Sequence, residues 1–135
     1  MAHTVKLSYV LPTFNEIENL GFIFNQIKYL EKNNDLEFIF IDDNSTDGTF
    51  DYISNQKNKF NNIRIYKRLD DKGLSKAIKA GFLISKGEYV VVMDTDGQHE
   101  IQTTKNLLNK IDKEKLDIVI ASRFLKESKI ENFPI

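Results

Sequence analysis

The chain has 135 residues, no cysteine and a formal net charge of −1, and 41% of its residues are hydrophobic. This length suits one domain with its own core, the lack of cysteine excludes disulfides and thiolate metal sites, and the near-zero charge gives no sign of a nucleic-acid partner. No run of about 18 apolar residues is present, so we expect none of these residues to span a membrane.

Apolar patterns typical of strands and helices alternate along the whole chain. The first is a short run at 5–11, which we expect to be a strand that stops at Pro12. A helical pattern follows from Ile17, with Asn15 as its N-cap and Glu18 completing a capping box. Further patterns predict strands at 36–41, 63–66, 89–93 and 118–121, and helices at 49–57, 74–85 and 101–111.

This alternation predicts an α/β fold, a mainly parallel sheet flanked by helices on both faces. In one common winding the strands lie in the order 3-2-1-4-5, and the loops after strands one, two and four become neighbours. Those loops carry acidic residues that folding does not need, and acids are costly to bury without a partner. Their expected convergence indicates a site, and the acids concerned are Glu16, Asp42, Asp43, Asp94 and Asp96.

The segment Met93-Asp94-Thr95-Asp96 is the most informative of these loops. Two carboxylates leave the end of a buried strand together, where they can hold a hard divalent ion that in turn binds substrate phosphates. Between residues 57 and 86 there are nine basic and only two acidic residues. Most of these basic residues are expected to form a solvated face, although Lys67, Arg68 or Lys72 could help to attract phosphates.

Five motifs in this order resemble a known family. They are Leu-Pro-Thr-Phe-Asn-Glu at 11–16, Ile-Asp-Asp-Asn-Ser-Thr-Asp-Gly-Thr at 41–49, Lys-Gly-Leu-Ser at 72–75, Asp-Thr-Asp-Gly-Gln-His at 94–99 and Ala-Ser-Arg-Phe at 121–124. Together they resemble the inverting family 2 glycosyltransferases, and within them the dolichol- and polyprenol-phosphate mannose and glucose synthases. The resemblance implies a Rossmann-like GT-A fold. It also implies transfer of a hexose from a GDP- or UDP-linked donor to a polyprenyl phosphate, with Mg²⁺ or Mn²⁺ as cofactor.

The resemblance also implies roles for the first two loops. Pro12, Thr13 and Phe14 would hold the nucleotide with their backbone and an aromatic wall, and Glu16 would hydrogen-bond the ribose. A carboxylate in the first turn of a helix could instead simply interact with the helix dipole.

In the second loop, the resemblance implies that Ile41 and Asp43 contact the base, while Asp42 orients the loop. Which of the two acids faces the ligand depends on the register of the strand, which the sequence leaves open. The other polar residues of this loop are expected to form turns and caps: Asn44, Ser45 and Asp47.

Asp94 and Asp96 are the expected catalytic residues. Asp96 would bind the metal with Gln98 as a second ligand, Asp94 would approach the sugar or ribose, and Thr95 would supply backbone contacts. Arg123 follows the last predicted strand, where a guanidinium could clamp a phosphate.

The chain departs from the family pattern chiefly in length, because the family's catalytic domain is longer. We therefore expect residues 1–135 to be a single nucleotide-sugar-binding domain that is truncated on its C-terminal side. We expect it to be cytoplasmic and to act at the cytoplasmic face of a membrane. Attachment to that membrane would come through parts outside this chain, which would also carry much of the acceptor site.

Three other functions fit parts of the pattern. A family 2 enzyme with a saccharide acceptor would have the same nucleotide half. A non-catalytic receiver-like domain would have paired acids after the first strand, where this chain has residues 12–16 instead. A dinucleotide-binding domain would have Gly-x-Gly-x-x-Gly in its first turn, which is absent.

Overall fold

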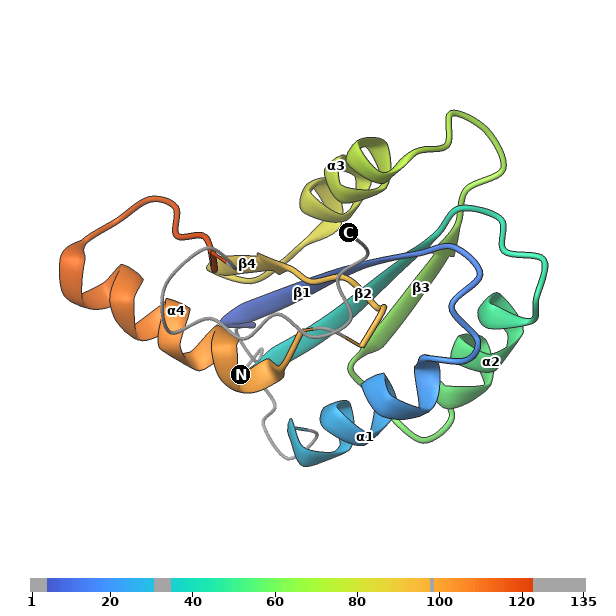
Figure 1. Ribbon diagram of the computed structural model, residues 1–135, viewed down its shortest axis with the longest axis horizontal. Coiled ribbons are helices and arrows are strands. Elements are labelled where there is room, and N and C mark those ends of the chain that lie inside the picture. The colour runs from blue at the N-terminus through green and yellow to red at the C-terminus, as the bar shows by residue number, and fades with distance from the viewer. Residues whose placement is uncertain (1–4, 31–34, 98, 123–135) are drawn as a thin grey trace. The chain divides into compact units, whose positions relative to one another are not determined.

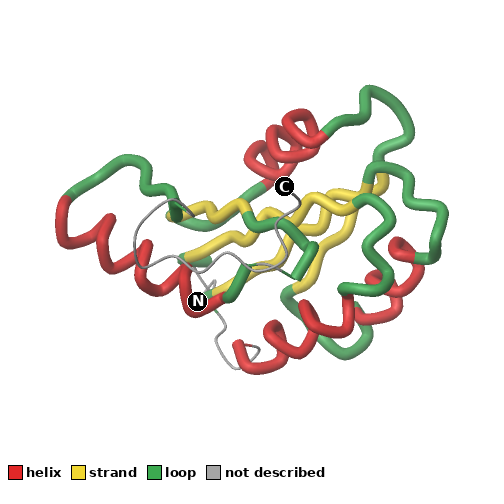
Figure 2. Tube along the Cα trace, in the orientation of Figure 1, coloured by secondary structure: helices red, strands yellow, loops and turns green. Residues whose placement is uncertain are grey.

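The computed structural model describes residues 5–30, 35–97 and 99–122, and the chain divides into two compact units, Met1–Gly97 and Gln98–Ile135. The first unit contains a four-stranded parallel sheet in the order β3-β2-β1-β4, which confirms the predicted α/β class (Figures 1 and 2). Its elements are β1 (Leu7–Thr13), α1 (Leu20–Leu30), β2 (Leu36–Asp42), α2 (Thr49–Gln56), β3 (Ile63–Lys67), α3 (Leu74–Ile84) and β4 (Tyr89–Val92).

Helices cover both faces of this sheet, with α1 and α2 on one side and α3 on the other (Figure 1). Successive side chains of β2 alternate between the two faces, as the pleat requires. Phe40 stacks on Phe24 of α1, with ring centroids 5.7 Å apart. Its neighbours Ile39 and Ile41 pack with Ala77 of α3 on the opposite face. Both central strands are buried along their full length, so their sequences read as continuous apolar runs.

Pro12 lies inside β1 and does not end it, contrary to the prediction from sequence. The register explains why the proline is tolerated. β1 pairs with β2 as far as Thr13, but it pairs with β4 only as far as Val10. The Val10 carbonyl accepts a hydrogen bond from the Met93 N–H, so the backbone groups of Val10 face β4. Pro12 lies two residues later in the strand, and its backbone groups therefore face the same side. Because the β4 ladder has already ended there, the missing N–H of Pro12 costs no ladder hydrogen bond.

The helix α1 begins at Leu20, three residues later than predicted, and Asn15 does not cap it. Asn15 has a left-handed backbone, with φ of +52°. Its side chain accepts a hydrogen bond from the N–H of Thr46, 31 residues away. The capping-box prediction is therefore wrong, because a long-range contact replaces the local one.

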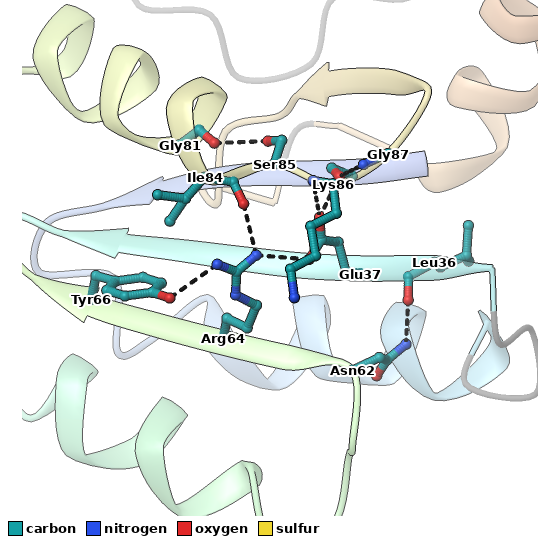
Figure 3. A network of polar contacts seen from close by, with 11 residues as sticks. Leu36, Glu37, Asn62, Arg64, Tyr66, Gly81, Ile84, Ser85, Lys86 and Gly87 are labelled. Atoms are coloured by element: carbon teal, nitrogen blue, oxygen red, sulfur yellow. Dashed lines mark hydrogen bonds and ion pairs between the residues drawn. The ribbon is translucent and has the colours of Figure 1, made fainter. Parts of the chain in front are cut away.

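A polar network occupies the end of the sheet where the strands begin (Figure 3). The Glu37 carboxylate is nearly buried and accepts hydrogen bonds from the Ser8 hydroxyl (2.5 Å), the Lys86 N–H (2.7 Å) and Arg64 Nη1 (2.9 Å). Arg64 also donates to the carbonyl of Ile84 at the end of α3. Burial acts to raise the pKa of Glu37, but these donors outweigh it and hold the pKa below its usual value. The network fixes the turn from α3 into β4 against the starts of β1 and β2.

In the second unit, α4 spans Ile101–Glu114, which confirms the fourth predicted helix. The strand expected at 118–121 is absent, because these residues have no regular secondary structure, and Ile118 and Ile120 are exposed. A strand needs a hydrogen-bonded neighbour, and an apolar sequence alone does not supply one. None of the helices in the described part of the chain is both long enough and apolar enough to cross a bilayer.

Candidate functional site

A cavity of about 510 Å³ lies where β1, β2 and β4 end. Because these strands are parallel, their carboxyl ends share one edge of the sheet, where open α/β folds bind ligands. The cavity confirms the predicted convergence of three acidic loops, since Glu16, Asp43 and Asp96 all line it. The full lining consists of Pro12, Thr13, Phe14, Glu16, Asp43, Lys72, Gly73, Leu74, Ala77, Asp94, Thr95 and Asp96.

The two acids that end β2 have different tasks. Asp42 is fully buried, and its carboxylate accepts from the Thr13 hydroxyl (3.1 Å), the Ser45 N–H (2.9 Å) and the Ser45 hydroxyl (2.5 Å). Asp43 faces the cavity instead. This division follows from the two-residue period of the strand, and it agrees with the predicted loop-orienting position of Asp42.

Asp43 is held in place by the loop between β3 and α3. Its Oδ1 pairs with Arg68 Nη1 at 2.9 Å, and its Oδ2 accepts from the Gly73 N–H at 2.8 Å. Gly73 has φ of +130°, a conformation that side-chain-bearing residues rarely adopt. Arg68 was considered from sequence as a phosphate-attracting residue. The structure shows it paired with Asp43 and outside the lining of the cavity.

In the loop after β4, one residue anchors the loop to β1 and its two neighbours line the cavity. Thr95 is 1% exposed, and its hydroxyl donates to the carbonyl of Pro12 at 3.2 Å. Asp94 and Asp96 flank this anchor, and both line the cavity. Two carboxylates held in this way offer the oxygen ligands that hard divalent cations prefer.

The described residues contain no cluster of three or more His, Cys, Asp or Glu side chains that could hold a metal ion. A two-carboxylate arrangement still fits Mg²⁺ or Mn²⁺, because Mg²⁺ usually takes one or two protein carboxylates and fills its shell with substrate phosphates and water. Gln98, the predicted second ligand, lies outside the described residues.

The loop after β1 is tied to the loop after β2 by four hydrogen bonds of 3.1 Å or less, which we call the inter-loop clasp. The N–H groups of three consecutive residues donate to side chains of the second loop and of the first residue of α2: Asn15 to Ser45 Oγ (2.9 Å), Ile17 to Asp47 Oδ2 (3.1 Å) and Glu16 to Thr49 Oγ1 (2.9 Å). The Thr46 N–H donates in return to Asn15 Oδ1 at 2.8 Å.

Asp47 belongs to the clasp and also serves the start of α2. Its Oδ1 accepts from both the N–H (3.0 Å) and the hydroxyl (2.6 Å) of Thr49, the first residue of that helix. Burial acts to raise the pKa of Asp47, but the donors Thr49 and Ile17 outweigh it and lower the pKa. Asp47 thus makes a turn contact, as predicted, but the N-cap of α2 is Gly48. Sequence reasoning missed the contact of Asp47 with the first loop.

Two further predictions concern Ile41 and Arg123. Ile41 was expected to contact the base, but it is 1% exposed and packs with Ala77 in the core, so its side chain cannot reach a ligand. The period of β2 places it on the same face as Ile39, under α3. Arg123 lies outside the described residues.

Sequence reasoning missed Gly73, Leu74 and Ala77, which line the cavity from the start of α3. Lys72, considered from sequence as a possible phosphate-attracting residue, also lines it, whereas Lys67 lies over the ring of Phe50 at 4.4 Å. The signal in the sequence was the motif at 72–75, which lies between a strand and a helix, where ligands of α/β proteins bind, but it was given no site role.

Known proteins resemble this chain in sequence and in fold. The sequence matches the family described as glycosyl transferase family 2 over residues 8–134. A dolichol-phosphate mannosyltransferase of Pyrococcus furiosus is 36% identical over 96% of this chain and 36% of its own length. An undecaprenyl-phosphate mannosyltransferase of Micrococcus luteus is 31% identical over 93% of this chain and 51% of its own. The chain therefore spans between about a third and a half of these relatives.

Solved structures share the fold. TarS of S. aureus in complex with UDP-GlcNAc has a TM-score of 0.69 at 21% identity, over 90% of this chain and 38% of that one. The mannosyltransferase PcManGT from Pyrobaculum calidifontis, in complex with GDP-Man and Mn²⁺, has a TM-score of 0.60 at 23% identity, over 67% of this chain and 27% of that one. These likenesses confirm the GT-A fold.

Proposed function

Because the chain belongs to glycosyl transferase family 2, we propose that it is the donor-binding part of an inverting hexosyltransferase. The observation that carries this proposal is the cavity in which Glu16, Asp43 and Asp96 meet, although they lie in three separate loops. The donor would be a nucleoside diphosphate sugar, with its base near Asp43 and its diphosphate near the loop after β4.

The residues present suit a base that carries a ring N–H at its pairing edge. An ionised Asp43 only accepts hydrogen bonds, which suits the ring N–H of guanine or uracil; adenine and cytosine have an acceptor at that ring position and offer only their exocyclic amino group. Phe14 is 57% exposed beside the cavity and could stack on a base or cover it. Pro12 and Thr13 also line the cavity, and Glu16 would accept a hydrogen bond from the ribose.

The diphosphate would lie by Asp94, Asp96 and Lys72. A divalent cation bound there would neutralise the charge that develops on the leaving diphosphate. Asp96 would hold this cation with Gln98, Asp94 would approach the sugar, Thr95 would add backbone contacts, and Arg123 would clamp a phosphate. Lys72 would add a positive charge beside the same oxygens.

The acceptor proposed here is a polyprenyl phosphate at the cytoplasmic face of a membrane. The relatives named above are dolichol-phosphate and undecaprenyl-phosphate mannosyltransferases. Such a phosphate is mostly ionised near pH 7, because the second pKa of a phosphate monoester is about 6. It therefore needs no strong general base, whereas a saccharide hydroxyl would need one.

Calorimetric titration of GDP and UDP into the purified chain, with and without Mn²⁺, tests the donor half of this proposal. We expect one of the two to bind, and to bind more tightly with Mn²⁺. Failure of both to bind at millimolar concentration would contradict it. The acceptor half is tested with a longer protein, by comparing sugar transfer to polyprenyl phosphate and to free saccharides.

A further inference from the structure

The inter-loop clasp engages three backbone donors of the loop after β1. The N–H groups of Asn15, Glu16 and Ile17 all bind side chains of the loop after β2 or of Thr49 at the start of α2, so none of the three points toward a ligand phosphate. Two residues of this loop line the cavity, Phe14 with its aromatic ring and Glu16 with its carboxylate as their functional groups. A carboxylate that only accepts hydrogen bonds selects hydroxyl donors over phosphate oxygens.

Asn15 makes this arrangement possible in two ways. Its φ of +52° turns the chain so that three successive N–H groups reach one neighbouring loop, and Asn tolerates this conformation better than most residues. Its side-chain carbonyl then accepts from the Thr46 N–H and closes the clasp from the other side. The hydroxyl of Ser45, which accepts from the Asn15 N–H, itself donates to the fully buried Asp42. The clasp is thereby connected to the rigid end of β2.

Glu16 is constrained at two points. Within the clasp, its N–H donates to Thr49, which is fully buried at the start of α2. Its Oε2 accepts from the side-chain amide of Asn19 at 2.8 Å. The backbone and one carboxylate oxygen are therefore fixed before any ligand arrives, which reduces the ordering cost of binding.

We infer that Asn15 is a positioning residue: by closing the inter-loop clasp it holds the Glu16 carboxylate where it accepts a hydrogen bond from the ribose hydroxyls of the bound nucleotide. This inference rests on the proposed function, in which Glu16 faces the ribose. Asn15 does not itself line the cavity.

The test compares binding of the preferred nucleoside diphosphate with its 2′,3′-dideoxy analogue, in the presence of Mn²⁺. The dissociation constant of the dideoxy analogue, divided by that of the nucleoside diphosphate, is the ribose preference, and it measures the contribution of the ribose hydroxyls alone. A variant that merely loosens the fold weakens both ligands and leaves this ratio unchanged, whereas misplacement of Glu16 lowers it.

Three variants separate the properties of Asn15. Asn15→Gly keeps access to the left-handed backbone but loses the acceptor, and we expect the ribose preference to fall about tenfold, the worth of a charged hydrogen bond. Asn15→Asp keeps the side-chain acceptor and also tolerates the left-handed backbone, so the ribose preference should stay within about twofold of the wild type. The matched control is Asn44→Gly, because Asn44 also has a left-handed backbone (φ of +61°) and lies next to the clasp without belonging to it.

Ser45→Ala removes the acceptor of the Asn15 N–H and leaves Asn15 intact. It should lower the ribose preference too, and it keeps the inference testable if Asn15→Gly does not fold. An unchanged ratio in both Asn15→Gly and Ser45→Ala would overturn the inference, as would an equal loss in Asn44→Gly. A wild type that binds nucleotide but ignores the ribose hydroxyls would also overturn it and leave the proposed function standing. A wild type that binds neither GDP nor UDP would instead contradict the proposed function.

Discussion

Arg68 and Asp43 form an ion pair at the rim of the cavity, with Nη1 and Oδ1 2.9 Å apart and side chains that are only 15% and 11% exposed. Arg68 also donates to the carbonyls of Asp71 and Gly73. One guanidinium therefore shapes the loop before α3 and fixes an acid that lines the cavity.

Asp43→Asn should weaken binding of the nucleoside diphosphate by about 10- to 100-fold, because a charged hydrogen bond contributes about 1.5–3 kcal/mol. The substitution also leaves Arg68 without its charged partner. Isothermal titration calorimetry at pH 7 measures the effect. Asp51→Asn, a change at an exposed acid of α2, is the control and should bind as the wild type does.

Asp96→Ala should abolish the enhancement of nucleotide affinity by Mn²⁺, with a loss of at least about tenfold, because Asp96 is the proposed direct ligand. Affinity measured without metal should change little. Titrations of both proteins with and without Mn²⁺ give the comparison, and Asp70→Ala serves as the control at an exposed acid outside the cavity lining. Full metal enhancement in the Asp96 variant would remove its proposed role.

Glu37→Gln should reduce the free energy of unfolding by about 1–3 kcal/mol at pH 7, because the partly buried Arg64 donor loses its charged acceptor. The pKa of Glu37 is lowered in the folded protein. The stabilisation that the Glu37 carboxylate gives to the folded state is therefore fully present above the unfolded-state pKa of about 4.3. It is lost as pH falls through the folded-state pKa.

Urea denaturation of both proteins at pH 7 and at pH 3.5 checks this sign, since the difference between them should shrink in acid. Glu114→Gln breaks only an exposed i,i+4 pair with Lys110 and should change stability by about 0.5 kcal/mol or less. A difference that stays constant down to acid pH would contradict the proposed linkage.

Gly81→Ala and Gly21→Ala should change stability in opposite directions. A Cβ on Gly81 of α3 would lie 2.3 Å from Cγ1 of Val10, a fully buried and stiff side chain, and overpacking of this kind costs about 1–3 kcal/mol. A Cβ on Gly21 of α1 meets nothing within 4 Å, so alanine should stabilise the helix by about 0.5–1 kcal/mol. Thermal unfolding of the pair measures both effects, and a stabilising Gly81→Ala would show that α3 can move away from β1.

The sequence by itself determined the alternation of strands and helices, the parallel sheet and the placement of acids where β1, β2 and β4 end. These features depend on hydrophobic periodicity and on which residues follow a strand, and both are local properties. Parallel strands bring their carboxyl ends to one edge of the sheet, so the meeting of Glu16, Asp43 and Asp96 follows from the order of the strands and the loops that succeed them.

Only the tertiary structure decided how these acids are held. Asn15 is not a helix cap because its partner Thr46 is 31 residues away, and Arg68 pairs with Asp43 across 25 residues. Pro12 fits inside β1 because its neighbour β4 ends early, and 118–121 is no strand although its sequence is apolar. Each of these features depends on a hydrogen-bonding partner from a distant segment, and the local sequence does not show where that segment lies in the folded protein.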